Sequence, residues 1–120
     1  MQGVHRFRQR LRMHAAGTSD DLDFGKITQP RHYTITHLVV RDATTTPTGA
    51  ITILVQGHGY DHIIDEVPAP AVGRAYVFTD EILLDDGETL TIRFAGATAA
   101  DVLEAFIEGQ WSEEPRQETP

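Results

Sequence analysis

The sequence predicts an all-β protein: one antiparallel β-sandwich, jelly-roll-like or immunoglobulin-like, with about eight strands. Two observations carry this prediction. Short runs rich in β-branched and aromatic residues recur along the 120-residue chain, and several alternate apolar with polar residues, which is typical of a strand with one buried face. Clusters of Gly, Pro, Asp and Thr separate these runs and supply the turns that short strands need.

The stretch from 77 to 109 shows both features. Apolar residues alternate with Thr and Arg over 90–94, and Leu83 and Leu84 end the apolar run before them. Between the two runs, residues 85–88 (Asp-Asp-Gly-Glu) supply turn chemistry, because Gly accepts a positive φ and Asp side chains cap nearby N–H groups. We therefore expect a hairpin here.

The other strands follow from the same patterns. Residues 33–41 (YTITHLVVR) are the most strand-like, and apolar residues on both faces at 38–40 predict a central strand. Residues 57–59 (Gly-His-Gly) turn the chain, so the segment after them is expected to pair back. In chain order, the expected strands outside the hairpin are 4–14, 22–27, 33–41, 50–56, 60–67 and 74–78.

Residues 4–14 allow a helix or a strand. Val4, Phe7 and Leu11 have helical spacing, whereas a strand would place a row of arginines on one face. We favour the strand, because a helix would scatter these arginines around its axis. The arginines in the row are Arg6, Arg8, Arg10 and Arg12.

Residues 99–108 also allow two interpretations. Residues 98–101 resemble a capping box, and Val102, Leu103 and Phe106 have helical spacing, so local propensity favours a short helix. The strand-rich remainder of the chain favours a closing strand. We predict the strand, with the short helix as the alternative.

Composition bounds the function. No apolar run approaches the roughly twenty residues that span a bilayer, so no membrane partner is expected, and the absence of cysteine excludes disulfides and thiolate metal sites. The net charge of −8 is uneven: residues 1–41 carry seven Lys/Arg against three Asp/Glu, whereas 42–120 carry three against fifteen. A basic N-terminal segment could therefore dock on an acidic neighbour, such as another copy of the chain.

One domain is expected over residues 1–111, in which 1–14 form a basic strand or arm. An acidic, poorly ordered tail is expected over 112–120. The arginine row could meet phosphates, but neither aromatic stacking nor a recognition helix is evident beside it, so nucleic acid is not the expected partner.

No motif indicates catalysis. Ser19 and Ser112 lack a nucleophile-elbow context, and the Gly-His-Gly turn lacks the further Gly and the helix of a phosphate-binding loop. His58 and His62 could bind a metal with a third ligand such as His37, but the flanking glycines disfavour the helix that would bring them together. We therefore expect a non-enzymatic protein without cofactor or metal.

Three segments carry a resemblance. They are YTITHLVV at 33–40 after a Gly-Thr-Ser loop, ILLDDGETL at 82–90, and GATAADVL at 96–103, which runs on to Gly109. Together they resemble small β-sandwich structural proteins of tailed bacteriophages, found on capsid surfaces and near the head–tail junction. The resemblance covers roughly residues 17–111 and rests largely on hairpin chemistry that unrelated sandwiches share. It implies an oligomer-forming virion component, assembled in the host cytoplasm, whose partners are its own copies, the major capsid protein or other virion proteins.

The leading hypothesis is therefore a capsid-associated decoration, cement or vertex protein, or a component of the head–tail junction or tail. A carbohydrate-binding or host-adhesion module is the alternative, and a small cupin-like metalloprotein using His58 and His62 is a third. The aromatic pool for carbohydrate binding is Tyr33, Tyr60, Tyr76 and Trp111. The residues expected at a protein interface are Arg6, Arg8, Arg10, Arg12 and Trp111. Trp111 could equally close the end of the core.

Overall fold

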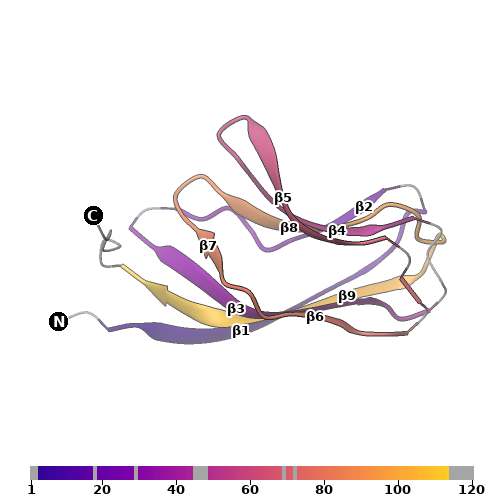
Figure 1. Cartoon of the computed structure of the whole chain (residues 1–120), viewed down its shortest axis with the longest axis horizontal. Helices are drawn as coiled ribbons and strands as arrows, with labels where there is room; N and C mark the ends of the chain where they lie inside the picture. Colours follow the sequence, from indigo (N-terminus) through magenta and orange to yellow (C-terminus); the bar gives the residue numbers. More distant parts are fainter. Residues whose placement is uncertain are drawn as a thin grey trace.

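The computed structural model describes residues 3–17, 19–28, 30–44, 49–68, 70–71 and 73–113. These residues form nine β-strands in two antiparallel sheets that pack face to face (Figure 1). The described ranges contain no helix, and hence none long and apolar enough to cross a membrane.

The first sheet has two long strands at its centre and a long strand at one edge. Its order is β1 (His5–His14), β9 (Val102–Ser112), β3 (His32–Asp42) and β6 (Tyr76–Phe78), and β7 (Ile82–Leu84) also pairs with β3. Because β6 and β7 pair with successive parts of the same strand, they act as one interrupted edge strand.

The second sheet has four strands. Its order is β2 (Asp20–Asp23), β8 (Thr89–Phe94), β4 (Ile51–Gly57) and β5 (Tyr60–Val67). The chain crosses repeatedly between the two sheets, which is the arrangement of a jelly roll. The predicted all-β sandwich is therefore confirmed.

The core lies between the two sheets. From the second sheet, the alternating residues Leu90, Ile92 and Phe94 of β8 are fully buried, as their period-two pattern predicts. From the first sheet, Leu103, Ala105 and Ile107 of β9 meet them, with alternate residues of β3 beside them. The position of β3 between β9 and the β6–β7 edge confirms the predicted central strand.

Residues 99–108 do not form the alternative short helix. Thr98 and Asp101 make a turn instead: the N–H of Asp101 donates to the Thr98 carbonyl (3.0 Å), and the N–H of Thr98 donates to the Asp101 carboxylate (3.2 Å). β9 then runs between β1 and β3 and pairs with both along its length. A helix would satisfy its hydrogen bonds internally and leave both neighbouring strands unpaired, so tertiary pairing overrides local propensity.

The predicted hairpin around 85–88 is wrong, although the turn exists. The N–H of Glu88 donates to the Asp85 carbonyl (3.0 Å), and Gly87 adopts φ 85°. However, β7 belongs to the first sheet and β8 to the second, so the turn carries the chain between sheets. Turn chemistry and alternation are local signals, and they are the same whether the strands on either side pair or separate.

The remaining expectations are mostly met. The predicted strands at 4–14 and 50–56 and the paired-back segment at 60–67 correspond to β1, β4 and β5. The strand expected at 22–27 lies earlier, at Asp20–Asp23, and Gly25 adopts φ 104° just after it. The final part of the expected tail, 114–120, lies outside the described residues.

Candidate protein interface

The arginine row lies on the outward face of the first sheet. Arg6, Arg8, Arg10 and Arg12 are all exposed, while the residues between them include Phe7 and Leu11, which pack against the core. Strand alternation explains this separation. The structure therefore brings the four predicted arginines together in one line along β1, and their role in contacts stays a prediction.

Two of the arginines have a partner on β9. Nε of Arg8 lies 2.9 Å from Oε1 of Glu108, and the guanidinium of Arg10 lies 4.6 Å from the centre of the Phe106 ring. Within the described part of the chain, Arg6 and Arg12 have no carboxylate at ion-pair distance. The row therefore keeps a net positive charge toward solvent.

The same residues expose backbone groups at the sheet edge. Ala15, just after β1, directs its backbone N–H and C=O toward the β9 side. Its N–H donates to the Asp101 carbonyl and its carbonyl accepts from the Ala100 N–H, each at 2.8 Å. The β1–β9 register is unbroken, and alternate residues of a strand direct their backbone groups to opposite sides. The N–H and C=O groups of the arginines therefore point away from the sheet.

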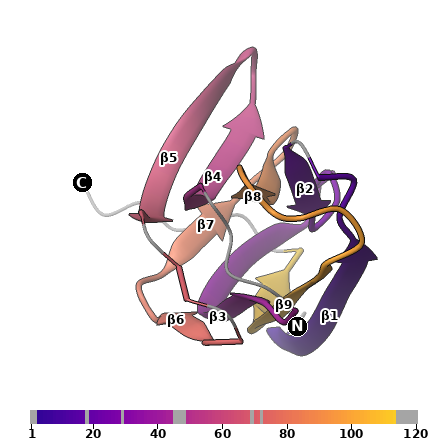
Figure 2. The same cartoon turned by 90° about the vertical axis from the view of Figure 1, so that its right-hand side faces the viewer.

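The opposite edge of the molecule is acidic and apolar. β5 pairs only with β4, and all its residues but the last are exposed. Tyr60, Ile63 and Ile64 expose 59%, 66% and 46% of their surface, which is high for large apolar residues. The acidic residues of β5 are Asp61, Asp65 and Glu66. Viewed from one end, β1 and β5 lie on opposite sides of the sandwich, and the β4–β5 hairpin stands away from it (Figure 2).

A shallow groove runs between β5 and the β6–β7 edge. One depression of about 180 Å³ is lined by Ile53, Ile64, Phe78 and Ile82, with Asp65 and Asp80 among its polar residues. A second, of about 220 Å³, continues along Ile64 and Ile82 to His62. The sandwich is therefore less tightly closed on this side, and the open side has an apolar lining with acidic groups beside it.

Trp111 takes part in an aromatic cluster. It pairs across the sheet with His5 and Tyr33, its ring stacks on His5 at 4.2 Å, and the guanidinium of Arg31 lies 4.1 Å from the ring centre. Tyr33 in turn makes an edge contact with Phe7 at 5.3 Å. Trp111 is half-buried in this cluster, so its place fits both interpretations of the sequence, and its interface role stays a prediction.

The histidines considered for metal binding are not assembled into a site. His58 lies in the β4–β5 turn with Nε2 3.1 Å from the Asp86 carbonyl oxygen, and the ring of His62 makes an edge contact with Tyr60 at 4.8 Å. His37 lies on β3, in the other sheet. Among the described residues no three His, Asp or Glu side chains converge to hold a metal ion.

The aromatic pool considered for carbohydrate binding is divided. Tyr33 and Tyr76 pack against the core, Trp111 is half-buried in its cluster, and Tyr60 is exposed on β5. These four residues do not make one exposed face.

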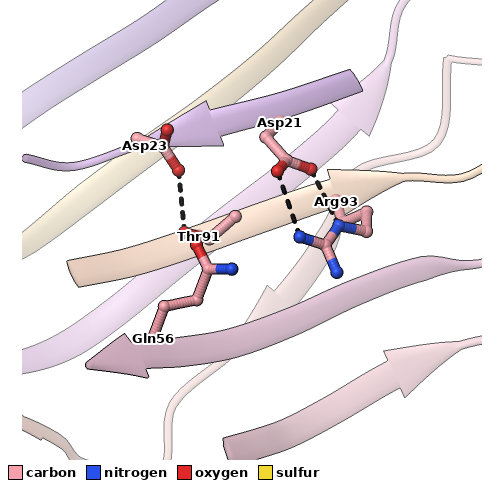
Figure 3. A network of polar contacts seen from close by, with 5 residues as sticks. All are labelled: Asp21, Asp23, Gln56, Thr91 and Arg93. Atoms are coloured by element: carbon pink, nitrogen blue, oxygen red, sulfur yellow. Dashed lines mark hydrogen bonds and ion pairs between the residues drawn. The ribbon is translucent and has the colours of Figure 1, made fainter. Parts of the chain in front are cut away.

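The sequence did not predict a polar network on the outward face of the second sheet (Figure 3). The side chains of this network join β2 to β8. Nε and Nη2 of Arg93 donate to the two carboxylate oxygens of Asp21 at 3.0 and 3.2 Å. The hydroxyl of Thr91, which is fully buried, donates to Asp23 at 2.7 Å and lies 2.9 Å from Oε1 of Gln56. The only sequence signal was the alternation of polar with apolar residues along β8, which does not identify partners.

The network also stabilises the positive charge of the Arg93 guanidinium. The hydrogen bonds that Arg93 donates to Asp21 raise the pKa of Arg93 above its ordinary value, with smaller contributions from the negative charges of Asp61 and Asp23. The guanidinium is therefore protonated throughout the working pH range. Its role is to join strands within one sheet.

The comparisons support the fold and leave the family open. The chain matches no family model and no curated protein. Among solved structures, it is similar to a Bacillus endospore appendage protein of a family of disulfide-linked pili, with TM-score 0.59, 18% identity, and 93% of this chain and 90% of that chain covered. Weaker similarities include a CBM4 protein (TM-score 0.41, 11% identity, 92% and 94% covered) and a chain of infectious bursal disease virus, Gt strain (TM-score 0.39, 12%, 92% and 31%). At 18% identity, the similarity to the appendage protein shows a shared fold alone.

Proposed function

We propose that this protein is a non-catalytic structural subunit that functions in an assembly with copies of itself. The observation that carries the proposal is that two opposite edges of the sandwich carry opposite charges. One edge, β1, carries four arginines, and the opposite edge, β5, carries three carboxylates and exposed apolar side chains. Two complementary surfaces on opposite sides of one molecule suit contacts that repeat from copy to copy.

The similarity to a pilus protein supports this proposal, because it shows that a filament subunit can have this fold. That protein belongs to a family of disulfide-linked pili, whereas this chain has no cysteine. Disulfides therefore cannot join copies of this chain, and charge and apolar burial would hold them together.

As the setting we propose the virion of a tailed bacteriophage, with the protein as a decoration, cement or vertex component on the capsid. The head–tail junction is the alternative position. Support comes from the sequence resemblance, two of whose segments correspond to the central strands β3 and β9. The partners would be copies of the chain and the major capsid protein.

The assembly is tested by light scattering on the purified chain at rising concentration. We expect a mass several-fold above 13.3 kDa. A monomer at every concentration would contradict self-assembly. The setting is tested separately: phage particles are purified from the bacterium that carries the gene and analysed by mass spectrometry. We expect the chain at a fixed ratio to the major capsid protein, and its absence from intact particles would contradict the virion setting.

A further inference from the structure

We propose that β1 of one copy adds to the β5 edge of the next copy, so that the first sheet of one molecule continues into the second sheet of its neighbour. This inference rests on the proposed self-assembly and specifies its geometry. The occupant of the β5 edge is thus a second copy of this chain, and the contact is a new strand pair.

Only β1 and β5 offer long free edges within the described residues. β1 has ten residues and β5 eight, whereas the other edges are β2 with four residues and β6 and β7 with three each. A strand at a sheet edge presents unpaired N–H and C=O groups, and a second strand of similar length can pair with them. On β1 these groups belong to the arginines, as the Ala15 contacts show.

The charges select which edges meet. β1 carries four arginines and no carboxylate, and β5 carries three carboxylates and no Lys or Arg. Pairing β1 with β1 would place arginines beside arginines, and pairing β5 with β5 would place carboxylates beside carboxylates; like charges across a strand pair are destabilising. Pairing β1 with β5 places opposite charges together, so the contact is heterologous.

Apolar burial acts in the same direction. Ile63 and Ile64 are exposed on β5, and a long exposed edge strand with apolar side chains is a surface that other strands tend to cover. The register shift between Ile53 and Leu54 leaves Ile64 as an extra residue on β5, which bends the strand. An added β1 strand would cover part of this surface.

The placement of the edges determines the kind of assembly. β1 and β5 lie on opposite sides of the sandwich (Figure 2), so each copy can use both edges at once. A heterologous contact of this kind repeats to give a ring when the rotation closes and a filament when it does not. A closed two-fold dimer is not expected.

A matched pair of variants tests the backbone contact. Arg10→Pro removes the charge and also the N–H at the free edge, and because the N–H of Arg10 points away from β9 it does not break the β1–β9 ladder. Arg10→Ala removes the same side chain and keeps the N–H. We expect Arg10→Pro to raise the apparent dissociation constant by at least about tenfold over Arg10→Ala. Equal assembly by two folded variants would overturn the strand pairing.

A charge exchange tests the partners and does not depend on how Arg10→Pro folds. One variant carries Arg6→Glu, Arg10→Glu and Arg12→Gln, which removes no ion pair present among the described residues and leaves β1 with two Glu against one Arg. The other variant carries Asp61→Lys and Glu66→Lys, which leaves β5 with two Lys against one Asp. In each variant both edges have the same sign, so each alone should be monomeric. An equimolar mixture should assemble, because the acidic β1 of one variant meets the basic β5 of the other.

The outcomes separate the two proposals. A mixture that stays monomeric, or a single variant that assembles as the wild type does, would overturn the β1–β5 contact while leaving self-assembly in place. A wild-type chain that is monomeric at every concentration would overturn the proposed function itself.

Discussion

Gly109 shows how one missing side chain shapes the first sheet. It lies in β9 between Phe7 and Ile35, beside the irregularity of β3 at 35–37. A Cβ at this position would collide with the Thr34 carbonyl oxygen and press on Ile35, both of them backbone contacts that cannot swing away. The central strand pair therefore depends on glycine here.

We expect Gly109→Ala to lower the free energy of unfolding by roughly 1–3 kcal/mol or more, because β3 must shift to admit the methyl group. Urea unfolding measures the change. Gly3→Ala is the control, since a Cβ at Gly3 meets nothing within 4 Å. Equal stability of the two variants would show that β3 yields at little cost.

Thr91 is a fully buried polar residue. Thr91→Val keeps the shape and removes the hydroxyl that donates to Asp23, while Asp23 is itself exposed and can turn to water. We therefore expect a loss of about 1 kcal/mol in thermal or urea unfolding. Thr89→Val, on the same strand and face but with no side-chain hydrogen bond among the described contacts, should change stability less. The reverse order would contradict the role of this hydrogen bond.

At the scale of the element, side chains help to hold the short strand β2 in its sheet. It has four residues, and Asp21 and Arg93 join it to β8 with two parallel hydrogen bonds. About a third of each side chain is exposed, so solvent screens the pair. We expect Arg93→Ala to cost at most about 1 kcal/mol, and less at high salt.

The measurement is urea unfolding of wild type and Arg93→Ala at two salt concentrations. A difference that stays constant with salt would indicate lost packing instead of lost charge. Alkaline pH within the range where the protein stays folded should not weaken the pair. A raised arginine pKa gives stability that is complete below the ordinary arginine pKa and is lost only as pH rises through the still higher pKa of the folded state.

At the scale of the whole molecule, charge at the two edges should control association. The Debye length falls from about 10 Å at about 0.1 M salt to about 3 Å at about 1 M. We expect the mass measured by light scattering to fall toward 13.3 kDa over this range, with unchanged circular dichroism. A mass that rises with salt would show that burial of Ile63, Ile64 and their neighbours dominates the contact.

Much of the candidate interface was already predictable from the sequence. The row Arg6 to Arg12 follows from strand alternation alone, and the structure places it on one exposed face. The acidic edge was not predictable from the sequence. Asp61 and Glu66 lie at a sheet edge only because β5 is the last strand of its sheet, and the strand order is not a local property of the sequence. The network of Asp21, Arg93 and Thr91 also required the strand pairing, since it joins residues about seventy positions apart.

The sequence by itself determined the strand segments, the core face of β8 and the all-β class, because alternation and turn residues act over a few positions. Only the tertiary structure decided which strands pair. It separated β7 from β8 into different sheets, and it made residues 102–112 a strand against their helical spacing. Pairing is a competition among all segments for hydrogen bonds and a shared core, so no local stretch contains its outcome.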